Sequence, residues 1–265
     1  MCGESEQGST GSVTIRAYAE LNDFLPLEQR GMEFQYPMSG GNDLKHLVES
    51  AGIPHTEIEV ILLNGSSAGF GAKVSSGDRI TLYPVFESVD VSPLLRLRPR
   101  PLRKTSFVLD VHLGRLAVIL RLLGFDALFP GDIPDGKLAE ISAEQGRILL
   151  TRDRMLLKRS LVTHGCFIRS SNPEEQAGEV LKRLDLSGSV KPFTRCTGCG
   201  GALEPIEKKK IISRLEPLTR AHYDEFSICE KCGKLFWKGS HYKSIMEIVD
   251  RVTGRHGVPG GLLYT

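Results

Sequence analysis

Two pairs of cysteines have the spacing of a metal site. Each pair has two residues between its thiols and a glycine after the second thiol, and the four residues are Cys196, Cys199, Cys229 and Cys232. The two-residue gap lets both sulfurs of a pair face one ion, and the glycine lets backbone amides turn toward sulfur. With 29 residues between the pairs, this pattern is typical of a zinc ribbon. We expect structural Zn²⁺, because a closed four-cysteine shell leaves no open position for chemistry.

Three aspartates are candidates for a second, catalytic metal site. Asp110 ends an apolar run, Asp135 opens a helical pattern, and Asp153 lies two residues beyond another apolar run. Carboxylates gathered at one place repel one another unless a hard cation neutralises them, and oxygen ligands select Mg²⁺ or Mn²⁺. Such an ion can lower the pKa of a bound water and clamp a phosphodiester. Taken singly, Asp135 and Asp153 also fit the role of helix N-caps.

The elements around these aspartates predict how they could meet. From residue 107 onward, short apolar runs alternate with helical patterns, which predicts βαβ units and a parallel sheet. The expected strands are 107–110, 125–129, 147–151 and 166–168, and the expected helices are 113–123, 135–145 and 172–184. Ligands of such sheets bind outside the carboxyl ends of the strands. If this topology holds, the three acids lie at that edge.

The N-terminal residues predict a separate α+β module. Strands are expected at 13–18, 32–37, 58–63 and 79–84, with a helix at 44–51 and a turn at Asn64-Gly65. This order resembles the ubiquitin-like (β-grasp) fold of the small sulfur carriers, which work through a free C-terminal Gly-Gly. Here the module continues into more protein, and Gly260-Gly261 is followed by four further residues. We therefore expect an interaction or substrate-docking module with a possible protein partner.

The central segment resembles the Mut-seven C-terminal RNase family, a branch of the PIN-like nucleases. The resemblance covers about residues 106–252 and depends on three matches: Asp110 before Leu-Gly-Arg-Leu-Ala, Asp135 before Leu138, and Leu-Leu-Thr-Arg-Asp ending at Asp153. It implies a PIN-like α/β domain and a metal-dependent ribonuclease, in which activated water attacks phosphorus and a 3′-hydroxyl leaves. The family's acidic doublet is here Pro134-Asp135, so Asp132 is an alternative to Asp135 as the second ligand.

Other side chains near the acids are candidates for RNA binding. Arg115, Arg152 and Arg154 are planar bidentate donors suited to phosphates. His112 could touch substrate or act as an acid, or it could simply occupy a helix start. Thr151 could hydrogen-bond a water on the metal, or cap a helix.

The cysteine module also carries basic and aromatic residues. Lys209 lies within a run of three lysines between the cysteine pairs, and Trp237 follows the second pair. Basic residues interleaved with aromatic ones suit stacking on unpaired bases beside a backbone. The alternative is that Trp237 packs within the ribbon and the lysines are merely solvated.

Charge and composition indicate the kind of partner, the location and the division of the chain into segments. Of the net charge of +2, residues 1–92 carry −8 and residues 93–265 carry +10, so the second part suits a phosphate polymer. The lack of a long apolar run and of a secretory signal pattern predicts a cytoplasmic protein that does not bind membranes. The expected segments are a disordered N-terminus (1–12), a ubiquitin-like domain (13–92), a basic Pro/Arg linker (93–105), a PIN-like nuclease domain (106–192), a zinc ribbon with a C-terminal helix (193–253) and a tail (254–265).

The sequence favours a metal-dependent ribonuclease acting on RNA, with a structured RNA such as tRNA as the first substrate to test. A non-catalytic RNA-binding adaptor with the same surface is the first alternative. A sulfur-relay protein, built on the ubiquitin-like domain and the cysteines, is the second.

Overall fold

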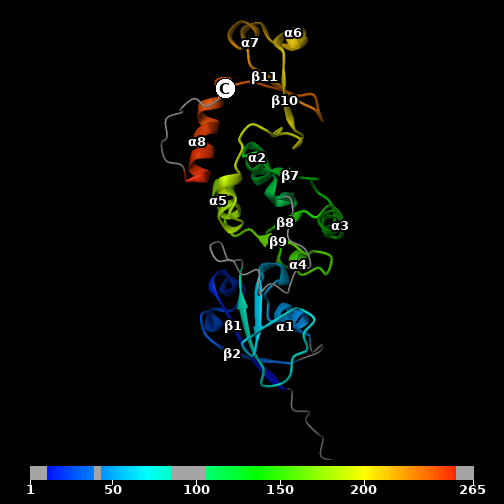
Figure 1. Cartoon of the computed structure of the whole chain (residues 1–265), viewed down its shortest axis with the longest axis vertical. Helices are drawn as coiled ribbons and strands as arrows, with labels where there is room; N and C mark the ends of the chain where they lie inside the picture. The colour runs from blue at the N-terminus through cyan, green and yellow to red at the C-terminus, as the bar shows by residue number, and fades with distance from the viewer. Residues whose placement is uncertain (1–10, 39–42, 85–104, 255–265) are drawn as a thin grey trace, which may run out of the picture. The chain divides into compact units, whose positions relative to one another are not determined.

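A computed structural model describes residues 11–38, 43–84 and 105–254 (Figure 1). The chain divides into two compact units. The first contains Met1–Leu102 and Asp153–Gly165, and the second contains Arg103–Arg152 and Cys166–Thr265. The segment predicted as a nuclease domain, 106–192, thus contributes to both units. The predicted N-terminus, linker and tail lie almost entirely outside the described residues.

A five-stranded sheet forms the body of the first unit. Its order is β2-β1-β5-β3-β4, and its strands are β1 (Ser12–Ala17), β2 (Phe34–Pro37), β3 (Val60–Leu63), β4 (Ser66–Ala68) and β5 (Arg79–Tyr83). The central strands β1 and β5 are parallel, and the other neighbours are antiparallel. Helix α1 (Leu44–Ser50) follows the first hairpin and buries its apolar side chains. This order confirms the predicted ubiquitin-like fold.

Local sequence explains these elements. Val13, Ile15 and Ala17 alternate with more exposed residues along β1, as a strand with one buried face requires. Asn64 and Gly65 join β3 to β4 with φ of 52° and 80°, the left-handed values of a tight hairpin turn. The three-residue strand β4 and the 3-10 helices at Ala19–Phe24, Leu27–Gln29 and His55–Glu57 were not predicted. Such short segments have too few residues to show a period.

The second unit is built on a four-stranded sheet of order β7-β6-β8-β9. The strands are β6 (Ser106–Leu109), β7 (Asp126–Leu128), β8 (Ile148–Thr151) and β9 (Gly165–Phe167), of which only β9 extends by one residue into the first unit's segment. Strand β6 pairs in parallel with both β7 and β8. The helices that follow the strands are α2 (Gly114–Leu122), α3 (Asp135–Gln145) and α5 (Pro173–Arg183) of the second unit, and α4 (Arg154–Leu157), which belongs to the first unit. The predicted parallel βαβ sheet is confirmed.

One apolar core joins this sheet to three helices. Leu116 and Leu120 of α2, Val180 of α5 and Val249 of α8 (Tyr242–Thr253) belong to it with the sheet residues. Arg251 of α8 also forms an ion pair with Glu174 of α5, with Nε 2.8 Å from Oε2. The C-terminal helix is therefore part of the core of the second unit.

The cysteine module contains a small antiparallel sheet, β10 (Leu203–Ile206), β11 (Phe226–Cys229) and β12 (Leu235–Phe236). Two short helices, α6 (Lys208–Ile211) and α7 (Pro217–His222), lie between β10 and β11, with a 3-10 turn at Ile212–Arg214 between them. Ile211, Leu215 and Phe226 form a separate small core. The final helix begins at Tyr242, with His241 at the N-cap position.

Within the described residues, no helix combines the length and the apolar composition needed to cross a bilayer.

Candidate functional site

Asp110 lies at the carboxyl end of β6, where the sheet topology predicts ligand binding. Its side chain is held by two hydrogen bonds: Thr151 Oγ1 donates to Oδ2 (2.7 Å), and the Val111 amide donates to Oδ1 (2.6 Å). Thr151 ends the adjacent strand β8 and is fully buried, and Asp110 is only 9% exposed. The two neighbouring strands thus bring a nearly buried carboxylate and a buried hydroxyl together. The sequence did not predict that Thr151 would bind Asp110 itself.

Asp135 is the first residue of α3, and the N-cap position belongs to Pro134. The N-cap alternative for Asp135 was therefore wrong, although its negative charge in the first turn suits the helix dipole. Asp135 and Asp132 are both exposed.

Asp153 is the N-cap of α4. Its Oδ1 accepts a hydrogen bond from the Met155 amide at 2.7 Å, and its side chain is exposed. The cap uses one lone pair of a carboxylate that has about four acceptor positions. Asp153 therefore serves as the cap of α4.

The three aspartates are divided between the two units, because Asp153 opens the second segment of the first unit. Among the described residues, the four cysteines are the only group of three or more potential ligands whose atoms converge within 4.8 Å. The meeting of the three carboxylates remains a prediction.

The basic candidates differ in their surroundings. His112, Arg115 and Arg152 are exposed, His112 in the turn Val111–Leu113 and Arg115 in the first turn of α2. Arg154 is engaged within the first unit, where its guanidinium donates to the Asp23 carbonyl (3.1 Å) and lies 5.0 Å from the centre of the Phe24 ring. No sequence pattern predicted this contact.

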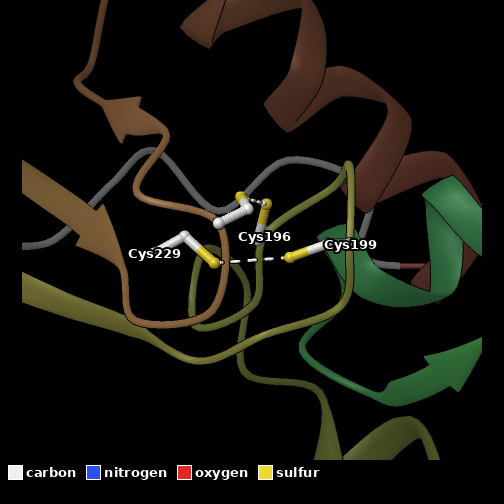
Figure 2. A group of neighbouring side chains, drawn as sticks. Cys196, Cys199 and Cys229 are labelled. Atoms are coloured by element: carbon white, nitrogen blue, oxygen red, sulfur yellow. Dashed lines mark hydrogen bonds between the residues drawn. The ribbon is translucent and has the colours of Figure 1, made fainter.

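The four cysteines form a compact thiol cluster (Figure 2). Sγ of Cys196 is 3.7 Å from Sγ of Cys232, and Sγ of Cys199 is 3.4 Å from Sγ of Cys229. A tetrahedral Zn²⁺ with Zn–S bonds of about 2.3 Å places its sulfurs about 3.8 Å apart. Gly200 and Gly233 have φ of 77° and 72°, so both turns need the residue that the sequence supplies. The cluster therefore fits a four-cysteine zinc site.

The pKa values of these thiols also favour a bound cation. Burial raises the pKa of Cys199 to about 12. Burial acts in the same direction on Cys229, but hydrogen bonds from the Cys232 backbone and from Cys199 lower its pKa to about 7. Without a metal, this cluster does not hold four thiolates at neutral pH. A bound Zn²⁺ would compensate their negative charge.

Arg121 connects the cluster to the sheet domain. It is 4% exposed, and it donates from Nε to the Ala127 carbonyl (2.8 Å) and from Nη1 to the carbonyls of Thr197 (3.2 Å) and Gly198 (2.8 Å). Burial lowers its pKa, and the nearby Cys199 and Cys196 act in the opposite direction. Arg121 was not predicted as a functional residue, although an arginine four positions after Ala117 on an apolar helix face was a usable signal.

Lys209 and Trp237 lie on the cysteine module. Lys209 is exposed and forms an ion pair with Glu207, and Trp237 is 42% exposed with its ring 6.2 Å from that of Phe226. Trp237 also lines a groove of about 1360 Å³ together with Phe236, Tyr242 and Lys238. The Trp237 side chain is therefore partly packed within the module and partly exposed.

Comparison with known proteins identifies two family models in the chain. The Mut7-C RNAse domain matches residues 105–249, and the Mut7-C ubiquitin domain matches residues 10–90. Two crystal structures of small archaeal modifier protein 1 from Haloferax volcanii are similar at 18% and 19% identity. They cover 29% and 30% of this chain and 99% and 100% of their own, with TM-scores of 0.23 and 0.24. Among curated proteins, none matches significantly.

Proposed function

This chain belongs to the Mut7-C RNAse domain family, and on that basis we propose that it is a metal-dependent ribonuclease that hydrolyses RNA phosphodiester bonds. The observation that carries the proposal is the nearly buried Asp110 carboxylate, held by Thr151 where β6 and β8 end. A charged group in such a place costs free energy to desolvate, so a role beyond folding accounts for it best. We further propose a structured RNA such as tRNA as substrate and the cytoplasm as location.

Asp110, Asp135 and Asp153 are the proposed ligands of Mg²⁺ or Mn²⁺, with Asp132 as the alternative to Asp135. Their donor set is oxygen only, which fits these hard cations. When bound, the ion would supply a water of lowered pKa and would stabilise the developing negative charge. The two hydrogen bonds to Asp110 fix its rotamer, so that little reorganisation is needed to receive the cation.

The exposed basic residues are proposed to hold the RNA. Arg115 and Arg152 would bind phosphates in bidentate fashion, and His112 would contact the substrate nearby. Arg154 could join them only by giving up its contacts with Asp23 and Phe24. On the cysteine module, Trp237 would stack on an unpaired base and Lys209 would contact the backbone.

The test is cleavage of small RNA by the zinc-loaded full chain, with Mn²⁺ or with EDTA. Asp110→Asn and Asp153→Asn keep the side-chain shape and remove the charge, so we expect each to lower cleavage by at least about 100-fold because a ligand of the metal is lost. Asp224→Asn is the matched control, since that exposed carboxylate pairs only with Lys208 among the contacts described here. Equal cleavage by all variants, or cleavage in EDTA, would refute the proposal.

An RNA-binding adaptor is the second candidate. It is favoured by the exposed side chains of Arg115, Lys209 and Trp237, which can bind RNA without a metal site. An adaptor would bind RNA without turnover, and its affinity would be unchanged or higher in Asp110→Asn, because negative charge has been removed.

A further inference from the structure

The chain segment that begins at Asp153 belongs to the same compact unit as the ubiquitin-like domain. Residues Asp153–Gly165 leave the end of β8, include the short helix α4, and return to β9. We call them the 153–165 segment. Its first residue is the third proposed metal ligand, so whatever holds this segment also constrains that ligand.

Three polar contacts join the 153–165 segment to the ubiquitin-like domain. His55 Nε2 lies 2.7 Å from the Val162 carbonyl oxygen, Lys158 Nζ donates to the Glu49 carbonyl at 2.6 Å, and Arg154 donates to the Asp23 carbonyl. They come from the beginning, middle and end of the segment. The segment is thus held along its length and not at one point.

The burial of the partner residues supports a stable contact. His55, Thr56 and Glu57 form a polar 3-10 turn between α1 and β3, yet they are 6%, 1% and 0% exposed. On the segment, Leu156, Leu157 and Val162 are fully buried. Polar turns of a small domain normally face water, and this one is buried.

His55 makes a polar contact through each nitrogen of its ring. Its Nδ1 lies 2.6 Å from Glu49 Oε1, and its Nε2 faces the Val162 oxygen, so both ring nitrogens face acceptors. The imidazolium form can donate to both oxygens at once. The ring also makes an edge contact with Phe70, whose centroid is 5.7 Å away. One residue thereby ties helix α1 to the end of the segment.

We propose that the ubiquitin-like domain positions Asp153 for metal binding by holding the 153–165 segment, with His55 and Lys158 as the positioning residues. This inference rests on the proposed metal site. Without these contacts, the segment gains conformational freedom. Binding of the cation must then also order the segment, and the lost conformational entropy reduces the free energy of binding. The affinity for Mn²⁺ should fall, while turnover at saturating Mn²⁺ should change little.

The experiment compares full-length, zinc-loaded protein with the double variant His55→Gln, Lys158→Met. His46→Gln is the matched control, because His46 is an exposed histidine on the same helix α1. Hydrogen exchange across residues 153–165 measures whether the segment is held. The spectroscopic signal of free Mn²⁺ measures binding directly, without depending on cleavage, and a melting curve verifies that the variant is folded.

We expect faster exchange in the segment and about 10-fold weaker Mn²⁺ binding in the double variant, with no change in the control. Lys158→Arg, which keeps a donor for the Glu49 carbonyl, should behave more like the unaltered protein than Lys158→Met. Unchanged exchange, or faster exchange with unchanged Mn²⁺ binding, would overturn the inference, as would unaltered protein that binds no Mn²⁺. If the unaltered protein binds Mn²⁺ but cleaves no RNA, the ribonuclease proposal fails, while weaker binding in the double variant still supports the positioning role.

Discussion

The Asp110 carboxylate accepts hydrogen bonds from two donors that differ in origin. The Val111 amide is its immediate neighbour in sequence, so that bond forms wherever the turn forms. Thr151 is 41 residues away, and its hydroxyl reaches Asp110 only because β6 and β8 are adjacent and parallel. The second bond therefore forms only when β6 and β8 have paired.

Thr151→Val tests this bond. Valine keeps the shape and removes the hydroxyl, so Asp110 Oδ2 loses its donor and its rotamer becomes less restricted. We expect Mn²⁺ affinity or cleavage to fall by about 10- to 100-fold, the usual effect of losing a hydrogen bond to a ligand, with a stability cost of about 1–3 kcal/mol. Mn²⁺ titration and urea unfolding measure the two effects. Thr151→Ser retains the hydroxyl and should keep most of the affinity; an equal loss in both variants would contradict this role.

At the scale of elements, α8 is attached to α5 by apolar packing and by one ion pair. The pair links Glu174 in the first turn of α5 to Arg251 in the last turn of α8, at favourable ends of both helix dipoles. The hydrogen bond from Arg251 lowers the pKa of Glu174. The folded state thus holds this carboxylate in its ionised form more strongly than the unfolded chain does.

Glu174→Gln should therefore have a pH-dependent effect. The stabilisation by the pair is fully present above the unfolded carboxyl pKa of about 4.3 and is lost as pH falls through the lower folded value. Because both side chains are substantially exposed, we expect a small decrease in melting temperature at pH 7 and none at strongly acidic pH. Melting curves of the two proteins across this range measure the difference. A difference that grows as pH falls would refute the assignment.

At the scale of the whole molecule, the cysteine cluster is coupled to the sheet of the second unit. Arg121 lies in α2, and its guanidinium binds carbonyls of the first cysteine turn and of β7. The cysteine module is therefore attached through a buried charged side chain as well as through its backbone. Loss of the ion would remove the thiolate charge that Arg121 faces and leave a buried guanidinium less well compensated.

Removal of zinc by a chelator should consequently affect more than the cysteine module. We expect increased hydrogen exchange in residues 196–201 and also in α2, together with a lower melting temperature. Addition of Zn²⁺ should restore both. Arg121→Met should lower zinc affinity by about 10- to 100-fold in a chelator competition, because the interactions around the ligands are lost. If exchange increases in the cysteine turns alone, the proposed coupling to α2 is wrong.

Much of this protein follows from local sequence. The two C-x-x-C-G turns specify a thiol cluster because four sulfurs and two left-handed glycines are encoded within short segments. The alternation of Val13, Ile15 and Ala17, and the strand–helix alternation after residue 107, predict the ubiquitin-like sheet and the parallel sheet in the same way. The position of Asp110 at the end of a strand could be predicted, because nearby residues determine where a strand ends.

Long-range contacts decided the rest. The bond from Thr151 to Asp110, the attachment of Arg121 to the cysteine turn, and the link from His55 to Val162 join residues separated by 41, 76 and 107 positions. No periodicity of either partner encodes such a contact, since it depends on how finished elements pack. Local patterns thus determined which side chains could do chemistry, whereas tertiary packing decided which of them are buried, held and coupled to one another.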